Sequence, residues 1–210
     1  MLELIQSVSV SADCRLKNVC THIVDCNHKT PDYVDDDTGY VCIRTSEMNE
    51  GKIIIDRLKN VTEETYCERT SSLKPEENDI VYAREGSFGD AVLIPDKPKF
   101  CLGQRTVVIR ADISKCYPQY LWYVLTSEYV MSQARNLNTG STAGRVNLDD
   151  IRNYRVKVPS LRVQNDLCKE IETILNSINH RITVLETMTK KLNEYRKSLI
   201  VSAITGKGGA

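Results

Sequence analysis

Residues 161–205 read LRVQNDLCKEIETILNSINHRITVLETMTKKLNEYRKSLIVSAIT, a stretch that contains neither glycine nor proline. Apolar residues recur in it at steps of three or four, the spacing of one face of an α-helix, with an irregularity near Ile178–Ile182. Pro159 precedes the stretch and Gly206 follows it, and both residues favour a helix boundary. We predict one helix of about 44 residues, which would extend roughly 66 Å.

A helix of that length needs a partner for its apolar face. The face consists of Leu167, Ile171, Ile174, Ile178, Ile182, Leu185, Met188, Leu192, Tyr195 and Leu199. Its near-heptad spacing is typical of a coiled coil. Packing of the helix on the core of its own domain is the alternative, and the length of the apolar face disfavours it.

The preceding residues, from about 15 to 158, have a different pattern. Short runs rich in Val, Ile and Tyr alternate with turn sequences such as Asp35–Gly39 and Lys74–Asn78. The predicted strands are His22–Val24, Tyr40–Arg44, Lys52–Asp56, Asp79–Ala83, Ala91–Ile94, Thr106–Arg110 and Tyr154–Val158. Helices are predicted from Pro118 to about Arg135 and from Asn147 onward. We expect an α/β (α+β) fold with a curved mixed sheet in residues 1–159, one long C-terminal coiled-coil α-helix in residues 160–206 and a tail at 207–210.

The composition predicts a cytoplasmic protein with an ordinary hydrophobic core. Hydrophobic residues make up 41% of the 210 residues, enough for one core and an appended element. No apolar run is long enough to span a bilayer, and the N-terminus MLELIQSVSV lacks a secretory signal pattern. The eight cysteines do not follow a disulfide framework. The formal net charge is zero, with 20 basic and 23 acidic residues in 1–160, so contact with nucleic acid would require a local basic face.

Two polar loops are candidates for such a face. Tyr82–Asp90 places Arg84, an aromatic residue and two glycines between two predicted strands. Asn136–Asn147 combines small hydroxyl and amide side chains, with Arg135 and Arg145 close by. Glycines let backbone N–H groups approach phosphate, and arginine can bind a guanine edge through two hydrogen bonds. Solvated turns remain the alternative interpretation of both loops.

Metal chemistry has two weak candidates. The first consists of Cys14, Cys20, His22, Cys26 and His28. Their spacing differs from the two close ligand pairs of ordinary zinc sites, so we predict no metal.

The second candidate is Pro31-Asp32 followed by Glu50-Gly51-Lys52, which satisfies the loose pattern of a metal-dependent nuclease. That chemistry needs the acid and the lysine on one strand, whereas Glu50-Gly51 is typical of a turn. The chain also lacks a phosphate-binding P-loop, a glycine-rich dinucleotide loop and a nucleophile elbow. We therefore expect no catalytic residues and no cofactor.

Several segments, taken in order, resemble one half of a type I restriction–modification specificity subunit. The first, Asp25-Cys26-Asn27-His28-Lys29-Thr30-Pro31, is similar to the family's Asp-Gly-x-His-x-x-Pro opening, with Cys26 in place of the usual glycine. The others are Tyr40–Thr45, Gly51–Ile53, Asn78–Val81, Phe100–Arg105, Tyr120-Leu121, Thr139–Thr142, Val158–Leu161 with Gln164, Leu192–Ile200 and Ala203–Lys207. Each is weak alone, and their common order makes the resemblance strong.

The resemblance implies a non-catalytic target-recognition domain that binds double-stranded DNA and guides separate methyltransferase and motor-nuclease (restriction) subunits. Helices of the conserved regions hold two such domains apart as an antiparallel coiled coil in this family. This sequence has one domain and one helix, so it corresponds to a half-length subunit or to a truncated piece of a longer one. As a half-length subunit we expect it to form a homodimer and to read a symmetric bipartite site. A metal-dependent nuclease and a coiled-coil adaptor that binds protein remain the alternatives.

Two sets of residues are expected to carry these functions. The expected DNA-binding residues are His28, Lys29, Thr30, Tyr33, Arg44, Arg84, Ser87, Arg105, Ser141, Thr142 and Arg145. The expected dimer contacts are Leu167, Ile171, Ile174, Ile178, Ile182, Leu185, Leu192 and Leu199.

Overall fold

A computed structural model of the whole chain describes residues 13–86, 89–137 and 144–206. The chain divides into two compact units, Met1–Cys168 and Lys169–Ala210. The first unit contains the strands, the short helices and the first turns of the long helix, whereas the described part of the second unit is helix. The α+β class with a long C-terminal helix is therefore confirmed.

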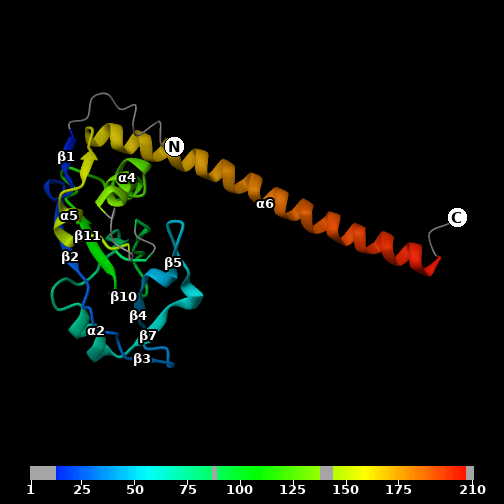
Figure 1. Cartoon of the computed structure of the whole chain (residues 1–210), viewed down its shortest axis with the longest axis horizontal. Helices are drawn as coiled ribbons and strands as arrows, with labels where there is room; N and C mark the ends of the chain where they lie inside the picture. The colour runs from blue at the N-terminus through cyan, green and yellow to red at the C-terminus, as the bar shows by residue number, and fades with distance from the viewer. Residues whose placement is uncertain (1–12, 87–88, 138–143, 207–210) are drawn as a thin grey trace. The chain divides into compact units, whose positions relative to one another are not determined.

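The strands of the first unit belong to several sheets rather than to one curved sheet. An antiparallel sheet has the order β2 (Cys20–Asp25), β11 (Thr106–Ala111), β8 (Ile80–Ala83) and β9 (Ala91–Leu93). A mixed sheet has the order β10 (Lys99–Leu102), β4 (Tyr40–Ile43), β7 (Lys59–Val61) and β3 (Tyr33–Val34), with β10 and β4 parallel. Figure 1 shows β4, β7 and β3 grouped together.

Two short ribbons complete the strands. One pairs β1 (Asp13–Arg15) with β12 (Arg155–Lys157), and the other pairs β5 (Met48–Asn49) with β6 (Lys52–Ile53). The predicted strand Lys52–Asp56 thus ends at Ile53, and the 3-10 helix η3 (Ile55–Arg57) follows it. The other 3-10 helices are η1 (Leu16–Asn18) and η2 (Thr45–Glu47).

The two four-stranded sheets share one hydrophobic core. Val41, Phe100 and Leu102 from the mixed sheet pack in one cluster with Val81 and Val108 from the antiparallel sheet. The chain passes from β10 in one sheet to β11 in the other through the turn at residues 103–105. The sequence predicted a single sheet because the residue pattern of a strand does not indicate which other strands it pairs with.

The helices differ from the prediction at two places. The helix expected from Pro118 to Arg135 is two helices, α3 (Pro118–Leu125) and α4 (Glu128–Leu137). They are separated at Ser127, whose hydroxyl donates to the carbonyl of Val124. The helix α2 (Glu63–Arg69) was not predicted; its N-cap Thr62 accepts a hydrogen bond from the Thr65 N–H. The short helix after Asn147 is α5 (Leu148–Arg152), and no side-chain hydrogen bond from Asn147 caps it.

The long helix α6 (Leu161–Thr205) has 45 residues and runs as one ribbon without interruption (Figure 1). It ends at Gly206, whose φ of 68° is the left-handed conformation common just after a helix. These bounds confirm the predicted helix. Within the described residues, no helix combines the length and apolar character that crossing a membrane requires.

Candidate nucleic-acid interface

Three backbone segments that are distant in sequence lie side by side next to the antiparallel sheet. The Arg84 N–H donates to the carbonyl of Arg105 (3.0 Å), and the Arg84 carbonyl accepts from the N–H of Val146 (2.9 Å). Glu85 and Arg145 form an antiparallel bridge. Segment 84–86 is therefore held between the turn 103–105 and segment 144–146, and their side chains are brought together.

Glu85 lies at the centre of this meeting point. One carboxylate oxygen, Oε1, is 3.2 Å from Nε of Arg145, and the other, Oε2, is 3.5 Å from Nε of Arg105. The two arginine side chains are 54% and 60% exposed, whereas that of Glu85 is 23% exposed. Arg105 also has a φ of 67°, rare for a residue with a side chain. Such strained positions are concentrated at functional sites.

Arg84 lies beneath this pair rather than beside it. Its side chain is 3% exposed, with Nη1 2.8 Å from Oδ2 of Asp25 and Nη2 3.7 Å from Oε1 of Glu85. Its Nε and Nη2 atoms have no hydrogen-bond partner in the described structure. The prediction that Arg84 reads a base from an exposed loop tip is therefore wrong for this conformation, because the guanidinium is buried against Asp25.

Residues 27–30, part of the predicted Asp-x-x-His segment, are fixed next to the same turn. The side chain of Gln104 donates to the carbonyl of His28 (2.8 Å) and to the hydroxyl of Thr30 (3.0 Å). Nε2 of His28 is 3.4 Å from Oδ2 of Asp25, the oxygen that also contacts Arg84. His28 and Thr30, together with Lys29, are exposed.

Arg69 anchors this segment from behind. Its guanidinium donates to the carbonyls of Leu102 (2.8 Å), Lys29 (3.0 Å) and Asn27 (3.0 Å). Because one side chain donates to three backbone carbonyls, the loop is fixed to the end of β10 and its exposed residues have a defined position.

Arg44 and Tyr33 form a second polar group next to the turn. The guanidinium of Arg44 lies 5.2 Å from the centre of the Tyr33 ring, and its Nε donates to Glu47 (2.9 Å). This hydrogen bond raises the pKa of Arg44. A Cβ on Gly103 would lie 2.3 Å from Cγ of Arg44, so the missing side chain lets Arg44 lie against the turn. The predicted residues Ser87, Ser141 and Thr142 lie outside the described residues.

The candidate metal ligands are divided between different places. Among described residues, the group whose ligand atoms lie within 4.8 Å of one another is Asp25, Cys26 and His28. The guanidinium of Arg84 already neutralises Asp25, and burial raises the pKa of the Cys26 thiol. A protonated thiol beside a carboxylate that is already paired makes a poor cation site.

The other residues of the two metal candidates lie elsewhere. Cys14 is in β1 and His22 in β2, where the His22 ring contacts the Thr21 hydroxyl (3.1 Å). Glu50 lies in the turn between β5 and β6, with a φ of 49°, whereas Asp32 precedes β3 in the mixed sheet. The geometry that a metal-dependent nuclease requires is not formed by these residues.

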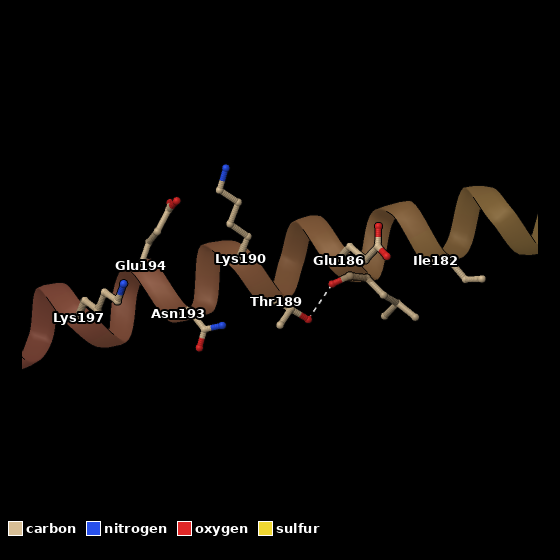
Figure 2. A pocket seen from close by; sticks show the side chains of 8 residues that line it. Ile182, Glu186, Thr189, Lys190, Asn193, Glu194 and Lys197 are labelled. Carbon is tan, nitrogen blue, oxygen red and sulfur yellow. Dashed lines mark hydrogen bonds between the residues drawn. The ribbon is translucent and has the colours of Figure 1, made fainter. Parts of the chain in front are cut away.

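The predicted dimer residues fall into two groups. Leu167 and Ile171 are buried, with 8% and 1% of their surfaces exposed, so neither is available to a second chain. The exposed residues, from 37% to 67%, are Ile174, Ile178, Ile182, Leu185, Leu192 and Leu199. In Figure 2, Ile182, Thr189 and Asn193 point to one side of α6, whereas Lys190 and Glu194 point to the opposite side.

Sequence reasoning missed the residues that organise the site. Asp25, Glu85, Arg69 and Gln104 were not among the predicted site residues. Glu85 follows Arg84 directly in the loop Tyr82–Asp90. An acidic residue in a loop predicted to bind DNA was the signal that could have indicated an ion pair with nearby arginines. Nothing in the local sequence showed that Arg69, in an unpredicted helix, would bind residues 27–29.

Comparison with known proteins identifies the class to which this fold and site belong. The family model "Type I restriction modification DNA specificity domain" matches residues 12–194. The chain belongs to that family.

Its relatives are longer proteins. The chain is 19% identical over 169 residues to the EcoBI specificity subunit of Escherichia coli, covering 80% of this chain and 35% of that protein. The HsdS subunit of Thermoanaerobacter tengcongensis superimposes with a TM-score of 0.59 at 16% identity, over 82% of this chain and 44% of that one. A second structure, described as the structural basis underlying complex assembly and conformational transition of the type I R-M system, superimposes with a TM-score of 0.66 at 17% identity. The match covers 93% of this chain and 50% of that one. The chain thus spans about a third to a half of the length of these relatives.

Proposed function

We propose that this chain binds double-stranded DNA in a sequence-specific manner as the target-recognition part of a type I restriction–modification specificity subunit, with no catalytic role of its own. The observation that carries the proposal is the convergence of Arg105 and Arg145 on Glu85, beside the fixed loop 27–30. Family membership gives the convergence its context.

The chemistry of this face suits a DNA groove. An arginine can bind O6 and N7 of guanine together, whereas lysine, histidine and threonine side chains contact phosphate. Arg105, Arg145, His28, Lys29 and Thr30 are all exposed. The net charge of zero is compatible with binding because contacts depend on a local basic face.

The long helix is proposed to pair with the same helix of a second copy. An exposed apolar face with near-heptad spacing is unfavourable in water and is buried in coiled coils. Glu170 and Glu172 lie towards one end of the face, whereas Lys191 and Lys197 lie towards the other. Antiparallel pairing brings these opposite charges together, whereas parallel pairing would place like charges together.

A symmetric target follows from such a dimer. Each copy would carry the same reader, and a closed two-fold dimer relates the readers by symmetry. Helices that extend roughly 66 Å would separate them by up to two turns of B-DNA, at about 3.4 Å per base pair. We propose that the dimer reads an inverted repeat and docks separate methyltransferase and restriction subunits, as the names of the relatives suggest.

Binding of the full chain to duplex DNA tests the proposal. Arg105→Ala and Arg145→Ala should each weaken binding to the preferred duplex by about 1–3 kcal/mol, which is a factor of about 5 to 150. Arg162→Ala removes the same charge from an exposed position in α6 and is the matched control. Equal affinities of all three variants and the parent would refute the proposed interface. DNA cleavage by the purified chain with Mg²⁺ would support a nuclease instead.

A further inference from the structure

The carboxylate of Glu85 is an unexpected group on a face that is proposed to meet DNA. A negative charge there repels phosphate, and an isolated exposed ion pair contributes about 0–1 kcal/mol. Glu85 is nevertheless in contact with three guanidinium groups, those of Arg84, Arg105 and Arg145. Its own backbone is fixed by the bridge to Arg145.

We propose that Glu85 is a positioning residue that holds Arg105 and Arg145 at a fixed separation and orientation for guanines at neighbouring base pairs. This inference rests on the proposed function and adds a residue that determines specificity. In this proposal Arg105 and Arg145 contact the DNA, and Glu85 contacts the two arginines but not the DNA.

The atoms that form the ion pairs support this role. Both arginines face Glu85 through Nε. Recognition of O6 and N7 of guanine requires two donors of one guanidinium, and the Nη pair at the tip is the end opposite the arginine stem. Contact through Nε fixes the plane of each guanidinium and the direction in which its tip points. Because one carboxylate holds both groups, their tips lie within a few base-pair steps of about 3.4 Å.

The base of the arrangement is rigid. Glu85 is 23% exposed, and the buried Arg84 is fixed beneath it by Asp25. The carbonyl of Arg105 and the N–H of Val146 both bind the backbone of Arg84. A long arginine side chain loses much conformational freedom when it binds, and an anchor formed beforehand reduces that loss.

Removal of the Glu85 charge distinguishes a positioning role from a purely electrostatic one. Glu85→Gln adds one unit of positive charge to the face, so a purely electrostatic role predicts tighter binding to every duplex. A positioning role predicts loss of base preference without loss of total DNA binding. The two roles are therefore separated by preference, not by affinity.

The experiment selects bound duplexes from a library with ten randomised base pairs, using the full chain and sequencing what is retained. The parent should enrich guanine at two neighbouring positions. Glu85→Gln should reduce this enrichment at least tenfold while retaining as much total DNA or more. Glu76→Gln is the matched control, because it also removes an acid that pairs with an arginine, Arg110 (3.3 Å); it should enrich guanine as the parent does.

A second variant separates positioning from misfolding. Glu85→Asp keeps the charge but withdraws the carboxylate by one methylene, and should give intermediate enrichment in a protein whose thermal midpoint matches that of the parent. Parental enrichment in folded Glu85→Gln and Glu85→Asp would overturn the inference. A parental preference without guanine would overturn it and leave the proposed function standing, whereas a parent that enriches no sequence would overturn the proposed function itself.

Discussion

The two units of this chain reverse the usual relation between residue type and exposure. In the first unit Arg84, a charged residue in a glycine-containing loop, is 3% exposed. In the second unit Ile182, Leu185 and Leu192 are 46%, 61% and 67% exposed. The arginine is buried because other segments of the first unit supply Asp25 and Glu85. The apolar helix face has no such partner in the described part of the second unit.

This difference separates a charged group that is packed within one chain from an apolar face that is exposed in it. A buried charge with two acidic partners fixes its neighbours whatever binds later. An exposed apolar face remains costly in water until a second surface covers it. The proposed recognition face is therefore expected to tolerate disruption of the proposed helix pairing, whereas that pairing should be sensitive to single charges.

The largest expected effect comes from placing charges in the helix face. Ile178→Asp with Ile182→Asp should weaken self-association by at least about 4 kcal/mol, or about a thousandfold, because four buried isoleucines per dimer become charged. Light scattering over a range of concentrations measures this. Lys190→Asp with Glu194→Asp, on the opposite side (Figure 2), should leave the dimer intact. A parent chain that is monomeric at tens of micromolar would contradict pairing with a second copy.

The second effect tests the buried arginine. Arg84→Met should lower the free energy of unfolding by about 3 kcal/mol, because Asp25 loses the charge that compensates it. Arg105→Ala, at a 60% exposed side chain, should cost less than about 1 kcal/mol. Urea unfolding compares the two. Adding Asp25→Asn to Arg84→Met should recover part of the loss, and equal costs for Arg84→Met and Arg105→Ala would contradict the burial of Arg84.

The parts of the fold that follow from local pattern were predictable. The bounds of α6 follow from the three-and-four spacing of its apolar residues between Pro159 and Gly206. Strands such as β8 and β11 were found from their Val and Ile runs. The assignment of β4 and β10 to a second sheet was not predictable, since it depends on parallel pairing between residues about sixty apart.

The candidate site was predictable in its residue types more than in its roles. Arg105 and Arg145 were expected on the face, and the structure brings both to Glu85. Arg84 has a similar local sequence but the opposite exposure, because its partners come from β2 and from its own neighbour. Asn78 shows a case where local sequence was informative: it ends the predicted turn Lys74–Asn78 and has a φ of 68°, which asparagine tolerates well.

A third effect compares two glycines with the same backbone conformation. Gly51 and Gly39 have φ values of 79° and 71°. A Cβ on Gly51 would lie 2.5 Å from Cζ2 of Trp122, whereas a Cβ on Gly39 meets nothing within 4 Å. The Trp122 ring is held by a hydrogen bond to the Ala91 carbonyl (2.7 Å), so it cannot move away easily.

Gly39→Ala should therefore destabilise the first unit by about 1 kcal/mol through backbone strain alone. Gly51→Ala should cost about 2–3 kcal/mol because steric overlap is added. Thermal unfolding of both variants gives the difference. If the two midpoints coincide, the packing of Trp122 against the β5–β6 turn is wrong.

The smallest expected effect is an alkaline loss of stability in the core of the first unit. The hydroxyl of Tyr82 lies 3.3 Å from that of Tyr154, and burial raises the pKa of Tyr82 to about 12. In the unfolded chain the pKa of tyrosine is about 10. The stability that the protonated Tyr82 provides is therefore fully present below pH 10 and is lost as the pH rises towards 12, because the unfolded chain releases this proton first.

Tyr82→Phe should reduce the loss of stability between pH 8 and pH 11 by about 1 kcal/mol. Urea unfolding at the two pH values measures it, with Tyr195→Phe at an exposed position of α6 as the matched control. An unchanged difference between the two pH values in Tyr82→Phe would mean that the buried hydroxyl pair exchanges protons with solvent in the folded state, and that the core of this unit is more open than its packing indicates.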